Sequence, residues 1–506
     1  MKIYDWISNH ASRVPGKVAL VDEHSGRQFS YLQLHQRIGA LAAYLQQQQG
    51  IKKGDRVAIL SPNCSEIYEL QFACGRIGAI FVPLNIRLTK AELQFMIDDL
   101  EPGLLICDGD FLSLGSALAN NCKQLSLLSL CMSDDTSGYE TAIDQYADKG
   151  IVKNIDVNDD DPLAILYTSG TTGHPKGAIL THGMVMMHAL NIIGPAKLNY
   201  DSVNLCFLPL FHTSGLNVYG NPCFLLGATT IVLRNVDPTQ ILSLINDQPR
   251  AISHFIAVPA IFQFLTLTPG FMETDFSGLE TVSVGGSPIS GITLEKVMAA
   301  GIPISQGYGM TETGPTVLAI EKDAPIEKIM SCGKPVIHVE IKLQTKTGQQ
   351  ASTGEIGELL LKGPSITPGY WRRDEANKKD FSDGWLHTGD AAYMDEDGYY
   401  FIVDRWKDMY ISGGENVYPA EVEAVIGQLD EILEVAVIGT EDEKWGEVGK
   451  AFISLKAGAT LTPEQVLAHC QSKLAKYKIP KTVVKLAELP HNATGKIAKK
   501  ELRARI

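Results

Sequence analysis

The stretch Tyr167-Thr-Ser-Gly-Thr-Thr-Gly-His-Pro-Lys-Gly177 decides how this 506-residue chain is interpreted. It follows the apolar run Pro162-Leu-Ala-Ile-Leu-Tyr167, a pattern typical of a buried strand. Positions 168–177 hold four hydroxyl residues, three glycines and one lysine. Glycines let backbone N–H groups approach an anion, hydroxyls add donors, and lysine adds positive charge. The stretch therefore predicts a phosphate-binding loop at the end of a strand.

The loop differs from the Walker A loop of other nucleotide-binding proteins. Lys176 follows Pro175 and precedes Gly177, whereas a Walker A lysine follows glycine and precedes Ser or Thr. A flexible Gly/Ser/Thr turn is the alternative, and this arrangement of residues disfavours it. Alone, the loop predicts only that the protein uses ATP.

Bulk composition narrows the classes of protein that the chain can belong to. A length of 506 residues exceeds one hydrophobic core, so we expect at least two domains. The formal net charge of −14 argues against nucleic acid as the main partner. Nine scattered cysteines, none in a C-x-x-C pair, indicate free thiols in a reducing compartment. With no signal-peptide pattern and no membrane-length apolar run, we expect a cytoplasmic protein.

Strand-like and helix-like segments alternate along the first three quarters of the chain. The expected strands lie at 55–60, 79–83, 104–107, 162–167, 205–208, 230–233, 254–258 and 281–284. Ser30 is expected to cap a helix with apolar positions at Leu34, Ile38 and Leu41. This alternation predicts an α/β fold in which helices cover parallel sheets.

The character changes after residue 336. Short strands with Gly-rich turns between 336 and 401 predict a small antiparallel, β-barrel-like piece. We place a boundary between residues 403 and 404, giving a large N-terminal domain (1–403) and a small, mobile α+β C-terminal domain (404–506). Residues 450–506 carry 12 basic and 3 acidic residues, which indicates either a solvated face or a lid over a phosphorylated ligand.

Five further motifs follow the loop in order. They are Phe211-His-Thr-Ser-Gly215, Gln306-Gly-Tyr-Gly-Met-Thr-Glu-Thr-Gly314, Gly384-Trp-Leu-His-Thr-Gly-Asp390, Asp404-Arg405 with Ser412-Gly-Gly-Glu-Asn-Val-Tyr-Pro-Ala-Glu421, and Leu489-Pro-His-Asn-Ala-Thr-Gly-Lys496. Together with the loop, this order resembles the adenylate-forming superfamily, and most closely its AMP-forming acid–CoA ligases, such as the fatty-acyl, 4-coumarate and benzoate CoA ligases. The resemblance runs from Tyr167 to Lys496. Before residue 160 the chain is similar only in general character.

The resemblance implies a first half-reaction in which a carboxylate attacks ATP and pyrophosphate leaves. It assigns the phosphates to the loop, the α-phosphate to Thr311, Mg²⁺ to Glu312, and the bridge between carboxylate and α-phosphate to Lys496. It places His212 at the junction of the acyl and adenylate sites, as an orienter of the carboxylate or as a base. The implied loop contacts are Thr168, Ser169, Gly170, Thr171, Thr172 and Lys176. The implied adenine and ribose contacts are Gly286, Ser287, Pro288, Tyr308, Asp390 and Arg405.

The resemblance also implies a second half-reaction, in which the thiol of coenzyme A attacks the acyl-adenylate. The small domain would rotate about Lys407 between the two steps. Gly413 and Gly414 would line the tunnel for the pantetheine arm, because absent side chains leave room for a thin chain. Trp445 is similar to a tunnel-side aromatic residue of some ligases. Lys499 and Lys500 are expected to be solvated helix residues.

The acid pocket is expected around residues 211–222 and the strand ends near them. Its implied lining is Phe211, Leu216, Tyr219, Gly285 and Val317. Residues 211–222 contain no acidic residue, which disfavours an amino acid substrate, and no arginine, which disfavours a dicarboxylate. The sequence predicts an aryl, cinnamate-like or medium-chain fatty acid.

Several functions stay open at this stage. A carrier-loading acyl-adenylating enzyme is the nearest alternative to the CoA ligase, since no carrier domain follows Lys496 in the sequence. A luciferase-type oxygenase and a noncatalytic binding module are less favoured, the second because Glu312 and Lys496 are present. The expected partners are a small carboxylic acid, ATP and CoA, with no nucleic acid and no membrane span. A homodimer is one oligomeric state that the sequence leaves open.

Overall fold

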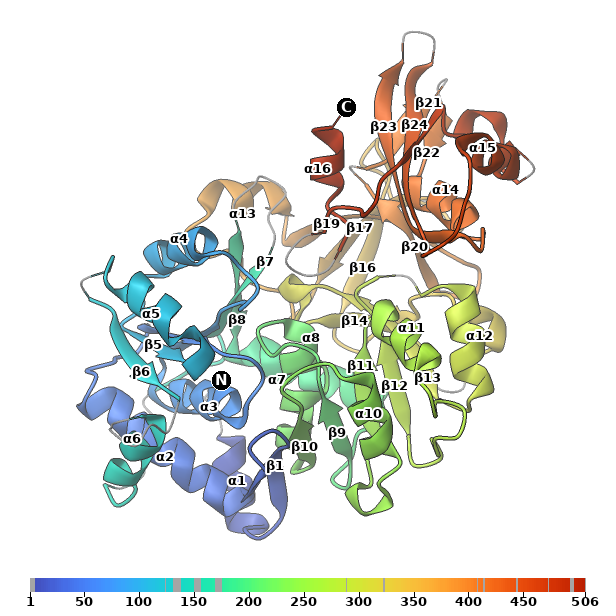
Figure 1. Ribbon diagram of the computed structural model, residues 1–506. Coiled ribbons are helices and arrows are strands. Elements are labelled where there is room, and N and C mark those ends of the chain that lie inside the picture. Colours follow the sequence, from blue (N-terminus) through green and yellow to red (C-terminus); the bar gives the residue numbers. More distant parts are fainter. Residues whose placement is uncertain are drawn as a thin grey trace. The chain divides into compact units, whose positions relative to one another are not determined.

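The computed structural model describes residues 5–122, 124–130, 138–149, 156–168, 175–287, 289–321, 324–406, 408–412, 415–442, 445–471, 473–491 and 496–505. The chain divides into two compact units, one made of residues 1–340 with 362–384 and the other of 341–361 with 385–506 (Figure 1). The expected boundary between residues 403 and 404 stays a prediction. The α/β fold with a large and a small domain is confirmed.

The first unit contains a sheet with the strand order β6-β5-β3-β4-β7-β8. Its first five strands run parallel and β8 runs antiparallel to β7. The strands are β3 (Arg56–Leu60), β4 (Ile80–Pro83), β5 (Leu104–Cys107), β6 (Ser126–Ser129), β7 (Pro162–Thr168) and β8 (Lys176–Thr181). Strand β3 alternates between two cores: Val57 and Ile59 face one, and Ala58 and Leu60 face the other. Both faces of the sheet are therefore covered, as a parallel sheet requires.

A second sheet of the first unit has the order β15-β14-β13-β12-β11-β9-β10-β1-β2. Its middle strands pair in parallel from β13 to β1. The strands are β1 (Val18–Asp22), β2 (Arg27–Ser30), β9 (Val203–Cys206), β10 (Thr229–Val232), β11 (His254–Ala257), β12 (Thr281–Val284), β13 (Ile304–Gly309), β14 (Thr316–Ala319) and β15 (Lys334–Pro335). The strands expected from the sequence at 205–208, 230–233, 254–258 and 281–284 are confirmed to within a few residues.

Helices fill three layers of the first unit. One layer packs in the hydrophobic core shared by the two sheets, and one lies on the far face of each sheet. The shared layer includes α2 (Tyr31–Gln47), α3 (Ser65–Ile77) and α7 (His182–Ile193). The outer layers include α4 (Lys90–Leu100) and α5 (Leu112–Ala119) on one side, and α10 (Pro238–Ile245), α11 (Pro259–Leu267) and α12 (Gly291–Ala299) on the other. The remaining helices of the unit are α1 (Trp6–Arg13), α6 (Tyr139–Tyr146), α8 (Thr213–Gly215), α9 (Asn221–Leu226) and α13 (Asp374–Asp380).

Helix α2 begins where the sequence predicts. The Ser30 side chain accepts a hydrogen bond from the Gln33 backbone, and the Gln33 side chain accepts one from the Ser30 backbone. This capping box satisfies two N–H groups that the first turn leaves without helical partners. The apolar face that follows, with Leu34, Ile38 and Leu41, is fully buried.

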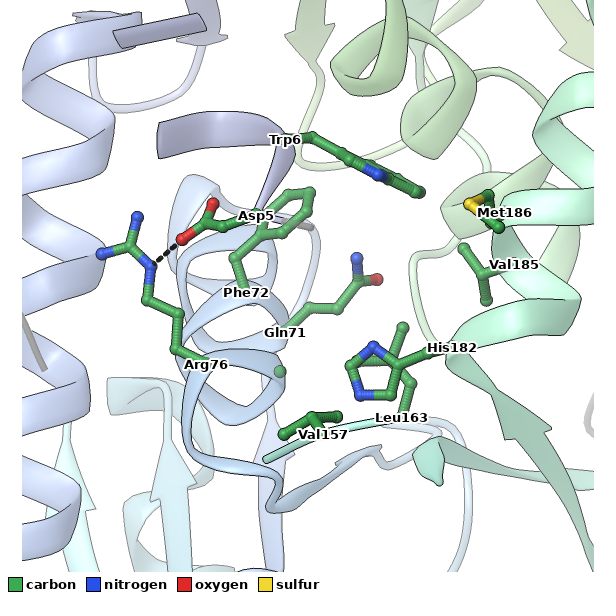
Figure 2. A pocket seen from close by; sticks show the side chains of 11 residues that line it. Asp5, Trp6, Gln71, Phe72, Arg76, Val157, Leu163, His182, Val185 and Met186 are labelled. Atoms are coloured by element: carbon green, nitrogen blue, oxygen red, sulfur yellow. Dashed lines mark hydrogen bonds and ion pairs between the residues drawn. The ribbon is translucent and has the colours of Figure 1, made fainter. Parts of the chain in front are cut away.

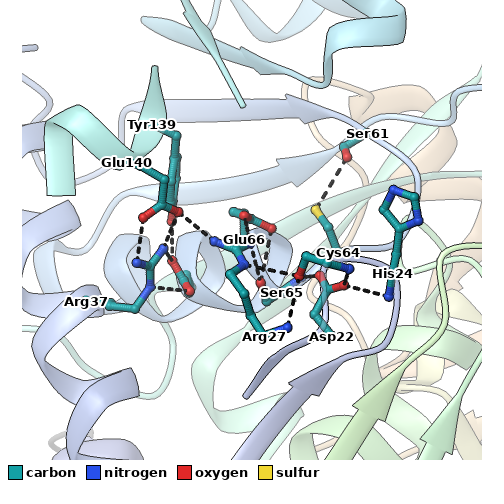
Figure 3. A network of polar contacts seen from close by, with 12 residues as sticks. Asp22, His24, Arg27, Arg37, Ser61, Cys64, Ser65, Glu66, Tyr139 and Glu140 are labelled. Atoms are coloured by element: carbon teal, nitrogen blue, oxygen red, sulfur yellow. Dashed lines mark hydrogen bonds and ion pairs between the residues drawn. The ribbon is translucent and has the colours of Figure 1, made fainter. Parts of the chain in front are cut away.

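A network of buried charges ties α2, α3 and α6 together (Figure 3). The Arg37 guanidinium donates to the carboxylates of Glu69, at 2.8 Å, and of Glu140, at 2.7 Å. The Tyr139 hydroxyl donates to Glu69 at 2.7 Å, and Arg27 adds a second cation beside Glu140. A buried carboxylate is stable only when partners replace its lost hydration, and these groups supply them.

The second unit contains two sheets. In the first, β17 (Gly357–Lys362) pairs antiparallel with β19 (Trp385–Met394), which pairs antiparallel with β20 (Tyr400–Arg405). This is the antiparallel piece that the sequence predicts, and β16 (Glu340–Gln344) leads into it. The second sheet has the strands β21 (Tyr410–Ser412), β22 (Glu415–Val417), β23 (Ile432–Asp442), β24 (Gly446–Leu455) and β25 (Thr482–Lys485), with the helices α14 (Pro419–Ile426), α15 (Pro463–Gln471) and α16 (Lys499–Arg503).

One segment departs from the strand pattern expected between residues 336 and 401. Residues 362–384 pack with the first unit and include helix α13 and the short strand β18 (Phe381–Ser382). An isolated antiparallel bridge joins Tyr370 to Ala178 of β8. The segment therefore brings residues close to the predicted phosphate loop from almost 200 positions away. In the described ranges, no helix has the length and apolar character needed to span a membrane.

Candidate active site

The predicted phosphate loop connects two antiparallel strands. Thr168 ends β7, Lys176 begins β8, and the two residues face each other in the ladder. The Thr168 hydroxyl donates to the Lys176 carbonyl at 3.4 Å. The two described ends of the loop therefore lie opposite each other. Ser169, Gly170, Thr171 and Thr172 lie outside the described residues.

The Lys176 side chain has two partners from the segment that packs beside the hairpin. Its ammonium forms an ion pair with Asp380 at 2.9 Å and lies 4.7 Å from the centre of the Tyr370 ring. Only 13% of the lysine side chain is exposed. The cation is thus held between an anion and an aromatic face, beside the end of the loop.

The predicted metal ligand Glu312 lies in a short 3₁₀ turn, Thr311–Thr313, between β13 and β14. It is 4% exposed, and its Oε1 accepts a hydrogen bond from the Tyr370 hydroxyl at 2.8 Å. The Glu312 carbonyl accepts another from the Thr367 backbone at 2.8 Å. Side chain and backbone of this glutamate are therefore both fixed by the segment 362–384.

The turn before Glu312 depends on a close backbone approach. A Cβ atom on Gly309 would lie 1.7 Å from the Pro315 carbonyl oxygen. Only glycine fits at this position, because any side chain would collide with the returning strand β14. The glycine therefore lets the chain reverse within the Thr311–Thr313 turn.

The predicted adenine contacts meet at the ends of two neighbouring strands. Strands β12 and β13 are parallel, with Val284 opposite Gln306. Gly286 follows β12 at φ +84°, a conformation that glycine adopts without strain, and Tyr308 lies near the end of β13. The carboxyl ends of parallel strands share one edge, so the turn at Gly285, Gly286 and Ser287 lies on the same edge as Tyr308. Pro288 lies outside the described residues.

The residues predicted for the acid pocket are mostly buried. The exposed fractions are 5% for Phe211, 1% for Leu216, 1% for Tyr219 and 0% for Val317. Leu216–Gly220 forms a π-helical turn, a rare geometry that is frequent at functional sites. His212 precedes this region, and its ring centre lies 4.8 Å from that of Phe211.

Side-chain hydrogen bonds tie the π-helical turn to the neighbouring elements. The Tyr219 hydroxyl hydrogen-bonds the Ser283 hydroxyl at 2.6 Å, which joins the turn to β12. Asn217 donates to Thr213 at 3.0 Å and accepts from Asn221 at 2.6 Å. Partners that lie on separate elements leave no sequence pattern, so these hydrogen bonds become visible only in the structure.

In the second unit, Asp390 and Arg405 are paired residues on the neighbouring strands β19 and β20. Asp390 is 6% exposed, and its backbone N–H donates to the Thr388 hydroxyl at 3.1 Å. The two positions predicted for ribose binding are thus brought together by strand register.

Lys496 begins the final described segment and is exposed. The expectation that Lys499 is solvated is wrong: it forms an ion pair with Glu423 at 2.7 Å, and only 19% of its side chain is exposed. Helix α16 places this lysine against α14, where it meets the partly buried carboxylate of Glu423. Lys500 is exposed, as expected. Trp445 is 43% exposed, and Lys407, Gly413 and Gly414 lie outside the described residues.

A separate pocket lies between α1, α3, β7 and α7 (Figure 2). Its walls include Trp6, Phe72 and Met186, with Arg76 bonded to Asp5 at one side. His182 also lines it, and burial lowers the pKa of this histidine to about 4. None of the residues predicted for nucleotide or acid binding is among the described residues that line this pocket.

Glu312 fits the metal that the resemblance implies. In the described part of the chain, no group of three or more His, Cys, Asp or Glu residues could hold a metal ion. Mg²⁺ is usually held by one or two carboxylates together with substrate phosphates and water. A single buried carboxylate, bonded to the tyrosine that also contacts Lys176, therefore suits Mg²⁺ that arrives with a polyphosphate.

Two family models match this chain. Residues 7–371 match the model described as AMP-binding enzyme, and residues 421–496 match the model described as AMP-binding enzyme C-terminal domain. The first match includes the phosphate loop, the motif at 211–215 and the motif at 306–314. The second match ends at Lys496.

Curated relatives and solved structures match over nearly the whole chain. A feruloyl-CoA synthase of an Amycolatopsis species is 37% identical over 500 residues, which cover 99% of this chain and 98% of the relative. An indoleacetate–CoA ligase of Aromatoleum aromaticum is 34% identical, with the same coverage. ATP-bound MatB from Rhodopseudomonas palustris has a TM-score of 0.89 at 32% identity, covering 99% of this chain and 98% of that one. The o-succinylbenzoate CoA synthetase MenE from Bacillus subtilis, in complex with its acyl-adenylate intermediate, has a TM-score of 0.87 at 30% identity, again covering 99% and 98%.

Proposed function

The chain belongs to the AMP-binding enzyme family, and we propose from this that it is an ATP-dependent acid–CoA ligase for aryl carboxylic acids. The observation that carries the proposal is the full-length match to ligases of aromatic acids, in a chain that retains Lys176, Glu312 and Lys496. The substrates are a carboxylic acid, ATP with Mg²⁺, and coenzyme A. The products are the acyl-CoA thioester, AMP and pyrophosphate.

The first half-reaction forms an acyl-adenylate. The carboxylate attacks the α-phosphorus of ATP in line, and the bond to pyrophosphate breaks. In our proposal Thr168–Lys176 binds the β- and γ-phosphates, Thr311 donates to the α-phosphate, and Glu312 holds Mg²⁺. Bound Mg²⁺ neutralises charge on the phosphate oxygens. Lys496 contacts the carboxylate and the α-phosphate as they meet, because its single charge sits on a flexible stem.

Other residues would bind the nucleotide and orient the acid. We assign adenine to Tyr308 with the turn Gly286-Ser287-Pro288, and the ribose hydroxyls to Asp390 and Arg405. Their positions at the ends of β12 and β13, and opposite each other on β19 and β20, support these assignments. His212 would orient the carboxylate.

The second half-reaction transfers the acyl group to sulfur. The thiolate of CoA attacks the acyl carbonyl carbon, a C–S bond forms, and AMP leaves with the electrons of the C–O bond. Lys407 as hinge, Gly413 and Gly414 as tunnel lining and Trp445 as tunnel-side residue stay proposals. The relatives are CoA synthases and CoA ligases by name, which favours free CoA over a separate carrier protein as acceptor.

The proposed acid is aromatic. Feruloyl, indoleacetate and 2-succinylbenzoate all name aromatic acids in the relatives. The buried residues Phe211, Leu216, Tyr219 and Val317 would give this chain an apolar cleft that suits an aryl ring. A medium-chain fatty acid is the second candidate, because apolar pockets discriminate modestly by size alone.

An acid panel tests the proposal. Ferulate, 4-coumarate, benzoate, indole-3-acetate and octanoate are offered with ATP, Mg²⁺ and CoA, and both pyrophosphate release and loss of free thiol are measured. We expect acid-dependent release of pyrophosphate, matched by thiol loss, with an aryl acid giving the highest kcat/KM. Release of pyrophosphate without thiol loss would contradict CoA as the acceptor. No release with any acid would contradict the enzyme assignment.

The proposal also includes the location and the oligomeric state of the protein. We infer a cytoplasmic location from the free thiols of the described cysteines. A homodimer also stays a prediction, which the molar mass in solution would test.

A further inference from the structure

Tyr370 contacts both Lys176, which is predicted to bind phosphate, and Glu312, which is predicted to bind Mg²⁺. Its hydroxyl donates to Glu312 Oε1 at 2.8 Å, and the ammonium of Lys176 lies 4.7 Å from its ring centre. The side chain is 6% exposed. One buried side chain thus contacts both a carboxylate and a cation that belong to separate sequence motifs.

The backbone of Tyr370 is held on both sides. The Tyr370 N–H donates to the Asn377 side-chain oxygen at 2.7 Å, and the Asn377 side-chain amide donates to the Tyr370 carbonyl at 3.1 Å. The bridge to Ala178 joins the tyrosine to β8, two positions after Lys176. Phe381, which directly follows α13, packs against the Tyr370 ring with 6.1 Å between the ring centres. These contacts leave the phenol little freedom to turn away from Glu312.

From this geometry we infer that Tyr370 is a positioning residue, which sets the Glu312 carboxylate for Mg²⁺ and seats Lys176 for the phosphates. A hydrogen bond to one carboxylate oxygen fixes the rotation of the group, so the metal ligand is oriented before ATP arrives. The aromatic face attracts the ammonium, so the lysine stays near the loop. The inference rests on the proposed function and adds one residue to it.

The hydroxyl contact with Glu312 and the ring contact with Lys176 can be tested separately, because replacing Tyr370 with phenylalanine keeps the ring and removes only the hydroxyl. In Tyr370→Phe we expect the affinity for ATP in EDTA to stay within twofold of wild type. The gain in ATP affinity on adding Mg²⁺ should fall about tenfold, the size of one hydrogen bond to a charged group. In Tyr370→Leu the ring is also lost, so the affinity in EDTA should fall as well. Isothermal titration calorimetry of the full-length chain with ATP, in Mg²⁺ and in EDTA, measures both quantities.

Tyr139→Phe is a matched control. Its hydroxyl donates to the buried carboxylate of Glu69 at 2.7 Å, the same chemistry at nearly the same distance, in the charge network of Figure 3. We expect this variant to lose thermal stability to a degree similar to Tyr370→Phe, while its gain from Mg²⁺ stays at the wild-type value. A purely structural role for Tyr370 would make the two variants alike in both measurements.

The outcomes separate this inference from the proposed function. A wild-type gain from Mg²⁺ in Tyr370→Phe, with wild-type enzyme active, would overturn the role of Tyr370 alone. A reduced gain together with a fall in kcat for pyrophosphate release, at unchanged KM for the acid, would support it. If wild-type protein releases no pyrophosphate with any acid, the proposed function fails, and the binding measurements still decide the role of Tyr370.

Discussion

At the scale of single residues, the two lysines proposed for the first half-reaction have different surroundings. Lys176 has an anion and an aromatic ring as fixed partners, whereas Lys496 is exposed. The exposure of Lys496 suits a residue that contacts two reactants as they meet, and the fixed position of Lys176 suits steady binding of phosphates.

Lys496→Ala tests the transient role. We expect acid-dependent release of pyrophosphate to fall by a factor of about 10²–10³, the usual cost of losing one group that stabilises transition-state charge. Thioester formation from preformed acyl-adenylate and CoA should stay within a fewfold of wild type. Both rates are measured on the same preparation. Equal loss in the two half-reactions would contradict the assigned role.

His188 of α7 gives a prediction about acid stability. It is fully buried, and neither ring nitrogen has a hydrogen-bond partner among the described residues. Burial lowers its pKa from 6.5 to about 3. As the pH falls below about 6.5, the unfolded chain takes up a proton at this residue and the folded chain does not, so stability is lost between pH 6.5 and 3.

His188→Leu should remove this contribution. We expect the free energy of unfolding to fall less steeply between pH 6 and 4, by up to about 1.4 kcal/mol per pH unit for one proton. Urea unfolding at several pH values measures the slope. A slope identical to wild type in His188→Leu would show that other groups govern acid unfolding.

At the scale of elements, the short turn between β13 and β14 carries Thr311 and Glu312. The turn exists because Gly309 lets β13 approach Pro315, and because residues 362–384 hold the backbone of Glu312 from outside. The shape of the motif around Glu312 therefore depends on the close approach of Gly309 to Pro315 and on the distant segment 362–384.

Gly309→Ala should disturb this turn. The added methyl would lie 1.7 Å from the Pro315 carbonyl oxygen, so the strand must move at a cost of about 1–3 kcal/mol or more. We expect a lower melting temperature and a loss of adenylation of at least about tenfold, because Glu312 shifts with the turn. Gly291→Ala, where a methyl group meets nothing within 4 Å, should change neither. Wild-type kinetics in Gly309→Ala would show that the turn tolerates the displacement.

At the scale of the whole molecule, the chain forms two compact units, and the proposed residues are divided between them. The first unit carries Lys176, Thr311 and Glu312, and the second carries Asp390 and Lys496. The resemblance implies that the residues after Lys407, which are one part of the second unit, move between the two half-reactions.

Lys407→Pro tests that motion at the proposed hinge. Proline fixes φ near −65°, so rotation about this residue is restricted while every other side chain stays the same. We expect pyrophosphate release within about threefold of wild type and CoA thioester formation reduced at least about tenfold. Lys407→Ala removes the side chain and keeps the backbone free, so it should affect both steps little. A proline variant with both steps normal would place the hinge elsewhere.

Most of the fold is predictable from local patterns. Strand-like runs, the capping box at Ser30 and the shift to short antiparallel strands all appear in the structure, because hydrophobic periodicity and capping depend on neighbouring residues. The expectation that Lys499 is solvated failed for the opposite reason: its partner Glu423 lies on another helix, and no local pattern reveals it.

By itself, the sequence determined the order of motifs, and with it the family and the type of reaction, since each motif is a short run that carries its own chemistry. The tertiary structure alone decided what surrounds those motifs. Asp380 reaches Lys176 from 204 positions away, and Tyr370 reaches Glu312 from 58 positions away. Contacts of this kind depend on how sheets and helices pack, which brings distant residues together without leaving a pattern in either segment.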